Sequence, residues 1–126
     1  QQGQVWRYEP KQNQYGSGVA DTLELFLESN DNLLLHNGDN ITIAPWGDLI
    51  ICEDGVDGIG HNRVVGITPT GEMYEIVQNM NSTGEFTGIC FSPDGTTLFV
   101  NMQLEGATLA ITGDWSRRHG GISGAG

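Results

Sequence analysis

Acidic and amide side chains gather at the ends of short apolar segments in this chain. Asp39 and Asn40 stand immediately before one segment, Glu53 and Asp54 directly follow the next, and Glu85 precedes a third. Carboxylate and amide oxygens are the ligands that Ca²⁺ takes, roughly 6–8 at a time. The sequence therefore predicts a site for a hard cation if the fold brings these segment ends together.

The stretch Asp54-Gly55-Val56-Asp57-Gly58 is the most suggestive local sequence for such a site. It is not an EF-hand loop, because its Asp spacing and its terminal residue do not match that motif. Taken alone, a Gly- and Asp-rich stretch favours a polar turn. Its expected position beside Asn40 and Glu53 makes a metal loop an equal alternative.

The other reactive side chains form no recognisable constellation. His36, His61 and His119 are scattered, and a loop histidine is more often structural than a ligand or a general acid. Cys52 and Cys90 lie within apolar segments, so we expect two buried free thiols. The sequence contains neither a CxxC pair nor a Gly-x-Ser-x-Gly motif. It thus indicates no thiolate metal cluster and no serine-nucleophile turn.

The elements that position the acidic residues belong to an internal repeat. The segment Ile41–Glu53 returns from Ile89 onward with one extra residue after the second glycine, and Pro45 and Pro93 are 48 positions apart. This period is typical of a β-propeller blade. A propeller closes with roughly 4–8 blades, and this chain has room for about two. We therefore expect an all-β fragment, about two blades of a larger propeller.

Short apolar segments bounded by turn residues predict the strands of these blades. The expected blade region covers residues 1–115, and residues 116–126 are expected to be a flexible tail. The predicted strands are Gln4–Tyr8, Thr22–Leu27, Asn40–Ile43, Asp48–Cys52, Arg63–Ile67, Glu72–Val77, Thr87–Phe91, Thr97–Val100 and Ala107–Ile111.

Blade topology predicts which residues meet at the mouth of the propeller channel. The innermost strand precedes the Pro-x-Gly turn and the next strand returns beside it, so the start of one and the end of the other share a mouth. The turn residues Trp46, Asp48 and Asp94 are expected at the opposite face. The residues expected at the mouth are Asp39, Asn40, Glu53, Asp54, Asp57, Glu85, Thr87, Asn101 and Gln103.

Charge and hydropathy exclude some classes of partner. The formal net charge is −11, with 16 acidic against 5 basic residues. Nucleic acid is therefore not expected as a partner, because phosphate backbones are bound by Lys/Arg surfaces. No apolar run is long enough to span a membrane, and no export signal is recognisable.

Beyond these patterns, a nearly continuous stretch, Glu85–Gln103, closely resembles the carboxy-terminal segment of the PhoX-type alkaline phosphatases. Thr108–Trp115 is similar to the terminal segment of that family, and Asp39–Ile43 and Asp48–Gly55 also fit it. The resemblance covers nearly the whole chain up to Trp115. It is most specific in the second repeat copy.

The resemblance implies a six-bladed propeller, an iron–calcium centre (Fe³⁺ and Ca²⁺) at the channel mouth, and hydrolysis of phosphate monoesters. It also implies export to the periplasm or the outside of a bacterial cell. Glu53 and Glu85 are the implied metal carboxylates, supported by Asp39 and Asn40. The iron-binding cysteine and the phosphate-binding arginine would lie in earlier blades, so the isolated chain is expected to be inactive. Its implied partners are the remaining blades of the same propeller.

Two alternatives belong to other functional classes. The chain fits a non-catalytic, calcium-stabilised propeller that binds proteins, because fold alone does not set function and open sheet edges favour pairing with another chain. A sugar-lactonase-like propeller also places Glu, Asn and Asp around a central Ca²⁺. The close match from Phe86 to Gln103 stands against the lactonase reading.

Overall fold

The described part of the chain is built of antiparallel β-strands. A computed structural model describes residues 3–11, 19–30, 35–55 and 62–115. These residues contain no helix, and hence none long and apolar enough to cross a membrane. Their strands are β1 (Gly3–Glu9), β2 (Thr22–Ser29), β3 (Gly38–Ile43), β4 (Leu49–Glu53), β5 (Arg63–Ile67), β6 (Met73–Gln78), β7 (Phe86–Phe91), β8 (Thr97–Met102) and β9 (Ala107–Thr112).

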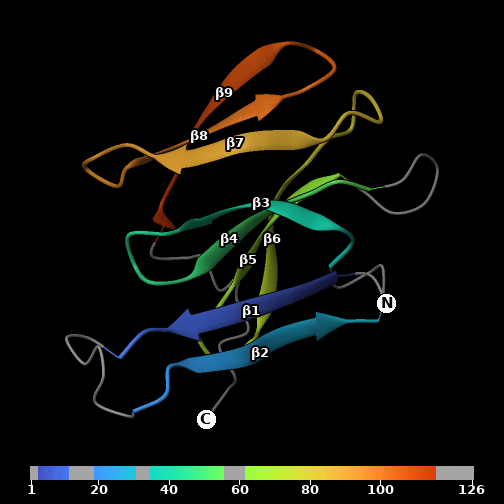
Figure 1. The fold of residues 1–126 in the computed structure, drawn as a ribbon. Helices are drawn as coiled ribbons and strands as arrows, with labels where there is room; N and C mark the ends of the chain where they lie inside the picture. Colours follow the sequence, from blue (N-terminus) through green and yellow to red (C-terminus); the bar gives the residue numbers. More distant parts are fainter. Residues whose placement is uncertain (1–2, 12–18, 31–34, 56–61, 116–126) are drawn as a thin grey trace, which may run out of the picture.

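The strands form three sheets that are stacked in the order of the chain (Figure 1). The first is the β1–β2 hairpin, the second has the order β3-β4-β5-β6, and the third has the order β7-β8-β9. Each strand pairs only with its sequence neighbours, as consecutive strands of a propeller blade do. The prediction of an all-β propeller fragment is confirmed, and the predicted strands lie within two residues of the observed bounds.

The two copies of the repeat form the same inner hairpin, β3–β4 in the first and β7–β8 in the second. In the first, Ala44 N–H donates to Asp48 C=O at 2.8 Å. In the second, Ser92 N–H donates to Thr97 C=O at 2.8 Å. Gly47 and Gly95 have φ values of 97° and 72°, a region that side chains rarely adopt. The Pro-x-Gly sequence therefore sets the turn in both copies.

Two apolar cores hold the sheets together. The larger core lies between the second and third sheets and includes Ile50, Cys52, Val64, Phe86 and Leu98. A smaller core, centred on buried Leu35, Ile51, Val65 and Ile67, joins the β1–β2 hairpin to the second sheet. Burial of this apolar area is the main force that keeps the sheets in place.

An aromatic cluster lies at the end of the second and third sheets that carries the Pro-x-Gly turns, here called the turn end. The rings of Trp46 and Trp115 are stacked with centroids 5.5 Å apart, and Phe91 packs edge-on against Trp46 at 5.3 Å. Such pairs add stabilisation beyond the area they bury. Trp46 and Trp115 therefore pack against each other at this end, whereas Trp6 is 52% exposed on the hairpin.

One prediction about the cysteines is wrong. Cys52 is a buried free thiol as expected, but Cys90 is exposed. Cys90 follows a register shift between Thr87 and Cys90, which turns its side chain to the face of β7 that no described sheet covers. The expected tail 116–126, His61, His119 and Asp57 lie outside the described residues.

Candidate metal centre

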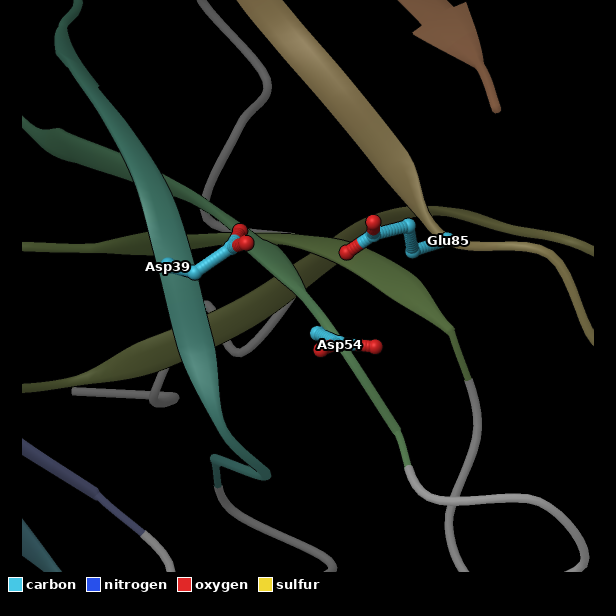
Figure 2. Close-up of side chains that lie close together, drawn as sticks. All are labelled: Asp39, Asp54 and Glu85. Carbon is cyan, nitrogen blue, oxygen red and sulfur yellow. The ribbon is translucent and has the colours of Figure 1, made fainter.

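Three carboxylates from three separate segments meet at one end of the stacked sheets. Asp39 lies in β3, Asp54 directly follows β4, and Glu85 directly precedes β7. One oxygen from each lies within 4.8 Å of the others. Figure 2 shows the carboxylates of Asp39 and Glu85 pointing toward each other, with Asp54 beside the space between them. We call these three residues the acidic cluster.

Backbone pairing brings the three segments together. Asp54 N–H donates to the Asn37 carbonyl at 2.9 Å and closes the β3–β4 ladder, and Gln103 N–H donates to the Glu85 carbonyl at 3.0 Å. β3 and β4 both contact β7 across the larger core. The acidic cluster therefore lies at the seam between the two sheets, at the mouth that the repeat topology predicts.

A β-bulge directs Asp39 into the cluster. Gly38 pairs with Glu53 and Asn40 pairs with Cys52, so Asp39 is the extra residue of the ladder. Bulges bend a strand and re-aim a side chain. Gly38 is required beside the bulge because an added Cβ would lie 2.5 Å from Ile51 Cγ2.

Asn40 hydrogen-bonds both to the acidic cluster and to the neighbouring sheet. Its Nδ2 donates to Asp39 Oδ1 at 2.9 Å, and its Oδ1 accepts the N–H of Gly88 at 3.2 Å. Gly88 has φ 61°, and an added Cβ would lie 2.6 Å from Asn101 Nδ2. Asn40 thus links the Asp39 carboxylate to the backbone of the neighbouring sheet.

Glu53 is also at this end, but its oxygens face other partners. It is fully buried, and Arg63 donates Nε–H to Oε2 and Nη2–H to Oε1, each at 2.7 Å. Oε1 also accepts the His36 N–H at 3.0 Å. This bidentate pair fixes β4, β5 and the segment before β3. It also engages the guanidinium of Arg63.

The electrostatics of the acidic cluster favour a bound cation. Partial burial, followed by the charges of Asp54 and Asp39, raises the pKa of Glu85 above its usual value, while a hydrogen bond from Gln103 opposes the shift. Glu85 Oε2 is buried without a hydrogen-bond partner in the described part of the chain. An unpaired buried carboxylate oxygen is costly, and a cation would remove both this cost and the mutual repulsion.

Cys52 lies near the acidic cluster without joining it. Burial first, and then the charges of Asp39 and Glu85, raise the pKa of its thiol to about 12. The Cys52 sulfur is not among the ligand atoms that lie within 4.8 Å of one another in the acidic cluster. The cluster is therefore an all-oxygen donor set within the described residues.

Four ligands were predicted from sequence, and the structure brings two of them, Asp39 and Glu85, together. Of the other two, Asn40 hydrogen-bonds to Asp39, and Glu53 pairs with Arg63. Asp54 completes the acidic cluster. It was expected at the mouth but is not among those four.

Sequence reasoning missed Asn62. This side chain accepts the Gly55 N–H at 2.6 Å and donates to the Thr83 carbonyl at 2.6 Å. It thereby ties the residue after Asp54 to the segment that leads to Glu85. An Asn ahead of a strand carries no local signal for this role, because both of its partners are distant in sequence.

The fold and the site define a class of protein: a β-propeller fragment with an acidic cluster at the seam between two of its sheets, at the end opposite the Pro-x-Gly turns. The family model described as Alkaline phosphatase PhoX matches residues 1–106, and the chain belongs to that family. The family is a propeller family of metal-dependent phosphatases. No curated protein and no solved structure gave a match. The similarity expected for Thr108–Trp115 lies outside the matched residues and stays a prediction.

Proposed function

We propose that this chain supplies one arc of the metal-binding mouth of an exported phosphomonoesterase. The observation that supports the proposal is the convergence of Asp39, Asp54 and Glu85 in a chain of the PhoX family. In this proposal residues 1–115 are carboxy-terminal blades and residues 116–126 are a flexible tail. The enzyme acts in the periplasm or outside the cell.

The donor set fits a hard cation. Three carboxylates offer up to six oxygens, and Ca²⁺ binds roughly 6–8 oxygens at about 2.3–2.6 Å in flexible geometry. The buried Oε2 of Glu85 gains a partner when a cation binds. Ca²⁺ is therefore the ion that this arc itself favours. Fe³⁺ enters the proposal through the family, with further ligands, including a cysteine, expected from other blades.

The cation is needed before a phosphate monoester can approach this end of the chain. Three carboxylates within 4.8 Å of one another repel a phosphate dianion. Bound metal ions would neutralise phosphoryl oxygens and favour an oxygen nucleophile. In this division of roles Asp39, Asp54 and Glu85 hold the ion, while Asn40 and Glu53 act as positioning residues.

Anomalous diffraction tests the assignment. Crystals of the chain grown with Ca²⁺ and Fe³⁺ are measured at the iron edge and at a longer wavelength that reveals calcium. We expect a peak about 2.3–2.6 Å from carboxylate oxygens of Glu85 and Asp39, and loss of that peak in Glu85→Gln. If no peak of either metal lies near these residues, the proposed site is wrong.

A turnover assay tests the division of labour between blades. The metal-loaded chain alone is expected not to hydrolyse p-nitrophenyl phosphate, because the channel and its other ligands belong to the remaining blades. Measurable turnover that is lost in Glu85→Gln would contradict this division. Calcium at the cluster without any affinity for inorganic phosphate would instead favour the calcium-stabilised binding module.

A further inference from the structure

Two buried asparagines lie where the second sheet leads into the third. Asn62 directly precedes β5 and Asn79 directly follows β6, and each is 8% exposed. The Asn79 N–H donates to the Asn62 carbonyl at 2.9 Å and extends the β5–β6 ladder by one pair. Because β5 begins at the end of the sheet where β4 stops, both asparagines lie at the same end as the acidic cluster.

The side-chain amide of Asn79 organises the connection between β6 and β7. Its Oδ1 accepts the N–H groups of Asn81 and Ser82 at 3.0 and 3.3 Å. Its Nδ2 donates to the Gly84 carbonyl at 2.8 Å and to Ser82 Oγ at 3.2 Å. Gly84 is the residue before Glu85. Asn79 therefore fixes the backbone from which the Glu85 carboxylate projects.

Asn62 connects this same segment to the end of β4. Its Oδ1 accepts the Gly55 N–H and its Nδ2 donates to the Thr83 carbonyl, each at 2.6 Å. Gly55 directly follows Asp54, and Thr83 lies two positions before Glu85. One amide therefore spans the two backbone segments that carry two of the three carboxylates.

An amide suits both positions because each requires a donor and an acceptor in fixed places. Asn62 and Asn79 each accept from a backbone N–H and donate to a backbone carbonyl. An asparagine side chain does both, whereas a carboxylate cannot donate. The two amides act on the backbone beside Asp54 and Glu85, so they influence a bound cation through the positions of its ligands.

We propose that Asn62 and Asn79 are positioning residues of the cation site, which together set the spacing of Asp54 and Glu85 across the seam. The inference rests on the proposed function, since it requires that the acidic cluster binds Ca²⁺. Three carboxylates within 4.8 Å of one another repel each other, so the backbone that carries them must be held. Residues that orient metal ligands typically change metal affinity by about 10–100-fold.

Calorimetric titration with Ca²⁺ compares the wild type with Asn62→Ala, Asn79→Ala and a control, Thr68→Val. Thr68 is 4% exposed, and its hydroxyl accepts the Glu72 N–H at 3.1 Å at the turn end of the same sheet. We expect each asparagine variant to bind Ca²⁺ at least about fivefold more weakly. Thr68→Val lowers stability in urea denaturation and keeps the wild-type Kd.

A double-mutant cycle with Glu85→Gln separates positioning from general destabilisation. Because Asn79 acts through Glu85, Asn79→Ala weakens binding by less than about twofold once Glu85→Gln is present. Ser82→Ala is a milder variant for the case that an asparagine variant does not fold, since it removes the Oγ that accepts the Gly84 N–H at 3.0 Å. It is expected to weaken binding by about twofold or more.

The outcomes distinguish this inference from the proposed function. Wild-type affinity in the asparagine variants and in Ser82→Ala overturns the inference and leaves the cation site in place. An equal effect of Asn79→Ala with and without Glu85→Gln, or an equal loss of affinity in Thr68→Val, also overturns it. Absence of Ca²⁺ binding by the wild type overturns the proposed cation site, and this inference with it.

Discussion

The two inner hairpins, β3–β4 and β7–β8, share a backbone and differ in the chemistry placed on it. The hydrogen bond that closes the first ladder, Asp54 N–H to Asn37 C=O, recurs in the second as Gln103 N–H to Glu85 C=O. The repeat also equates Asp39 with Thr87 and Asp54 with Gln103. The first hairpin thus presents two carboxylates at the mouth, and the second presents neutral side chains at the same positions.

At Glu85 the second copy is acidic and the first copy is neutral. Its counterpart in the first copy is Asn37, which has φ 48°. The second copy therefore contributes its acidic residue at the start of β7, directly across the seam from Asp39 and Asp54. The comparison teaches that neither hairpin holds the site alone, and that the seam between two similar hairpins concentrates the charge.

The largest expected difference between the copies concerns Glu53, whose counterpart in the second copy is Met102. Glu53→Gln leaves the Arg63 guanidinium, only 11% exposed, without its bidentate carboxylate. We expect a loss of about 3–5 kcal/mol in the free energy of unfolding. Met102→Leu, a change of similar volume, is expected to cost less than about 1.5 kcal/mol.

Urea denaturation measures both values. If Glu53→Gln costs no more than Met102→Leu, the buried pair does not hold the end of β4, and Glu53 becomes available as a metal ligand.

The two cysteines give the next contrast. Cys52 is buried, its pKa is raised to about 12, and thiolate is the reactive form, whereas Cys90 is exposed. At about pH 8 we expect Cys90 to react with a disulfide reagent at least ~100-fold faster than Cys52 in the native chain. The absorbance of the released thiolate follows the reaction, and Cys90→Ser assigns the phases. Equal reaction rates would contradict the different burial of the two thiols.

A smaller effect on stability is expected at two equivalent positions, one in β5 and one in β9. Gly66 pairs with Ile50, and its counterpart Ala110 pairs with Phe99. A Cβ at Gly66 would lie 2.1 Å from Tyr74 Cζ, and Tyr74 donates its hydroxyl to Asp48 at 2.7 Å. Gly66→Ala is therefore expected to cost about 1–3 kcal/mol by overpacking.

The reverse exchange, Ala110→Gly, is expected to cost only about 0.5–1 kcal/mol. Thermal unfolding of both variants compares them. A neutral Gly66→Ala would show that Tyr74 can leave this position at no cost.

The smallest expected effect is a pH dependence of calcium binding. The raised pKa of Glu85 means that this carboxyl keeps its proton to a higher pH than a free glutamate. Because protons and Ca²⁺ compete for the ionised form, affinity falls as pH falls. We expect a loss of about threefold or more between about pH 7.5 and about pH 5. The same titration of Glu85→Gln should show a weaker dependence, and an equal dependence would place the titrating group elsewhere.

Much of the fold could be predicted because local patterns determine it. The proline and glycine of each turn and the apolar run after it predict the hairpins, and Arg63–Ile67 was predicted with its observed bounds. Hairpin topology alone predicts that the start of one inner strand and the end of the next lie at the same end of the sheets. Asp39 and Glu85 therefore could be predicted to meet, although 46 positions separate them.

The remaining features depend on contacts that no local pattern encodes. A glutamate at the end of an apolar strand has the same sequence context whether it binds a metal or a buried arginine. The pairing of β4 with β5 places Glu53 beside Arg63, which donates hydrogen bonds to it. Cys90 has an apolar sequence context, but the register shift before it turns its side chain outward. Ile41 and Ile43 lie in a predicted strand but are 53% and 64% exposed, at the groove beside the β1–β2 hairpin.

Calorimetric titration with Ca²⁺ tests the central claim, that the seam between the two hairpins is a cation site. Glu85→Gln removes one carboxylate of the acidic cluster, and Glu72→Gln removes one from the turn end of the second sheet. We predict that the wild type and Glu72→Gln bind Ca²⁺ with the same Kd, and that Glu85→Gln binds at least about tenfold more weakly. Equal affinity of all three chains, or no binding by any, would contradict the account.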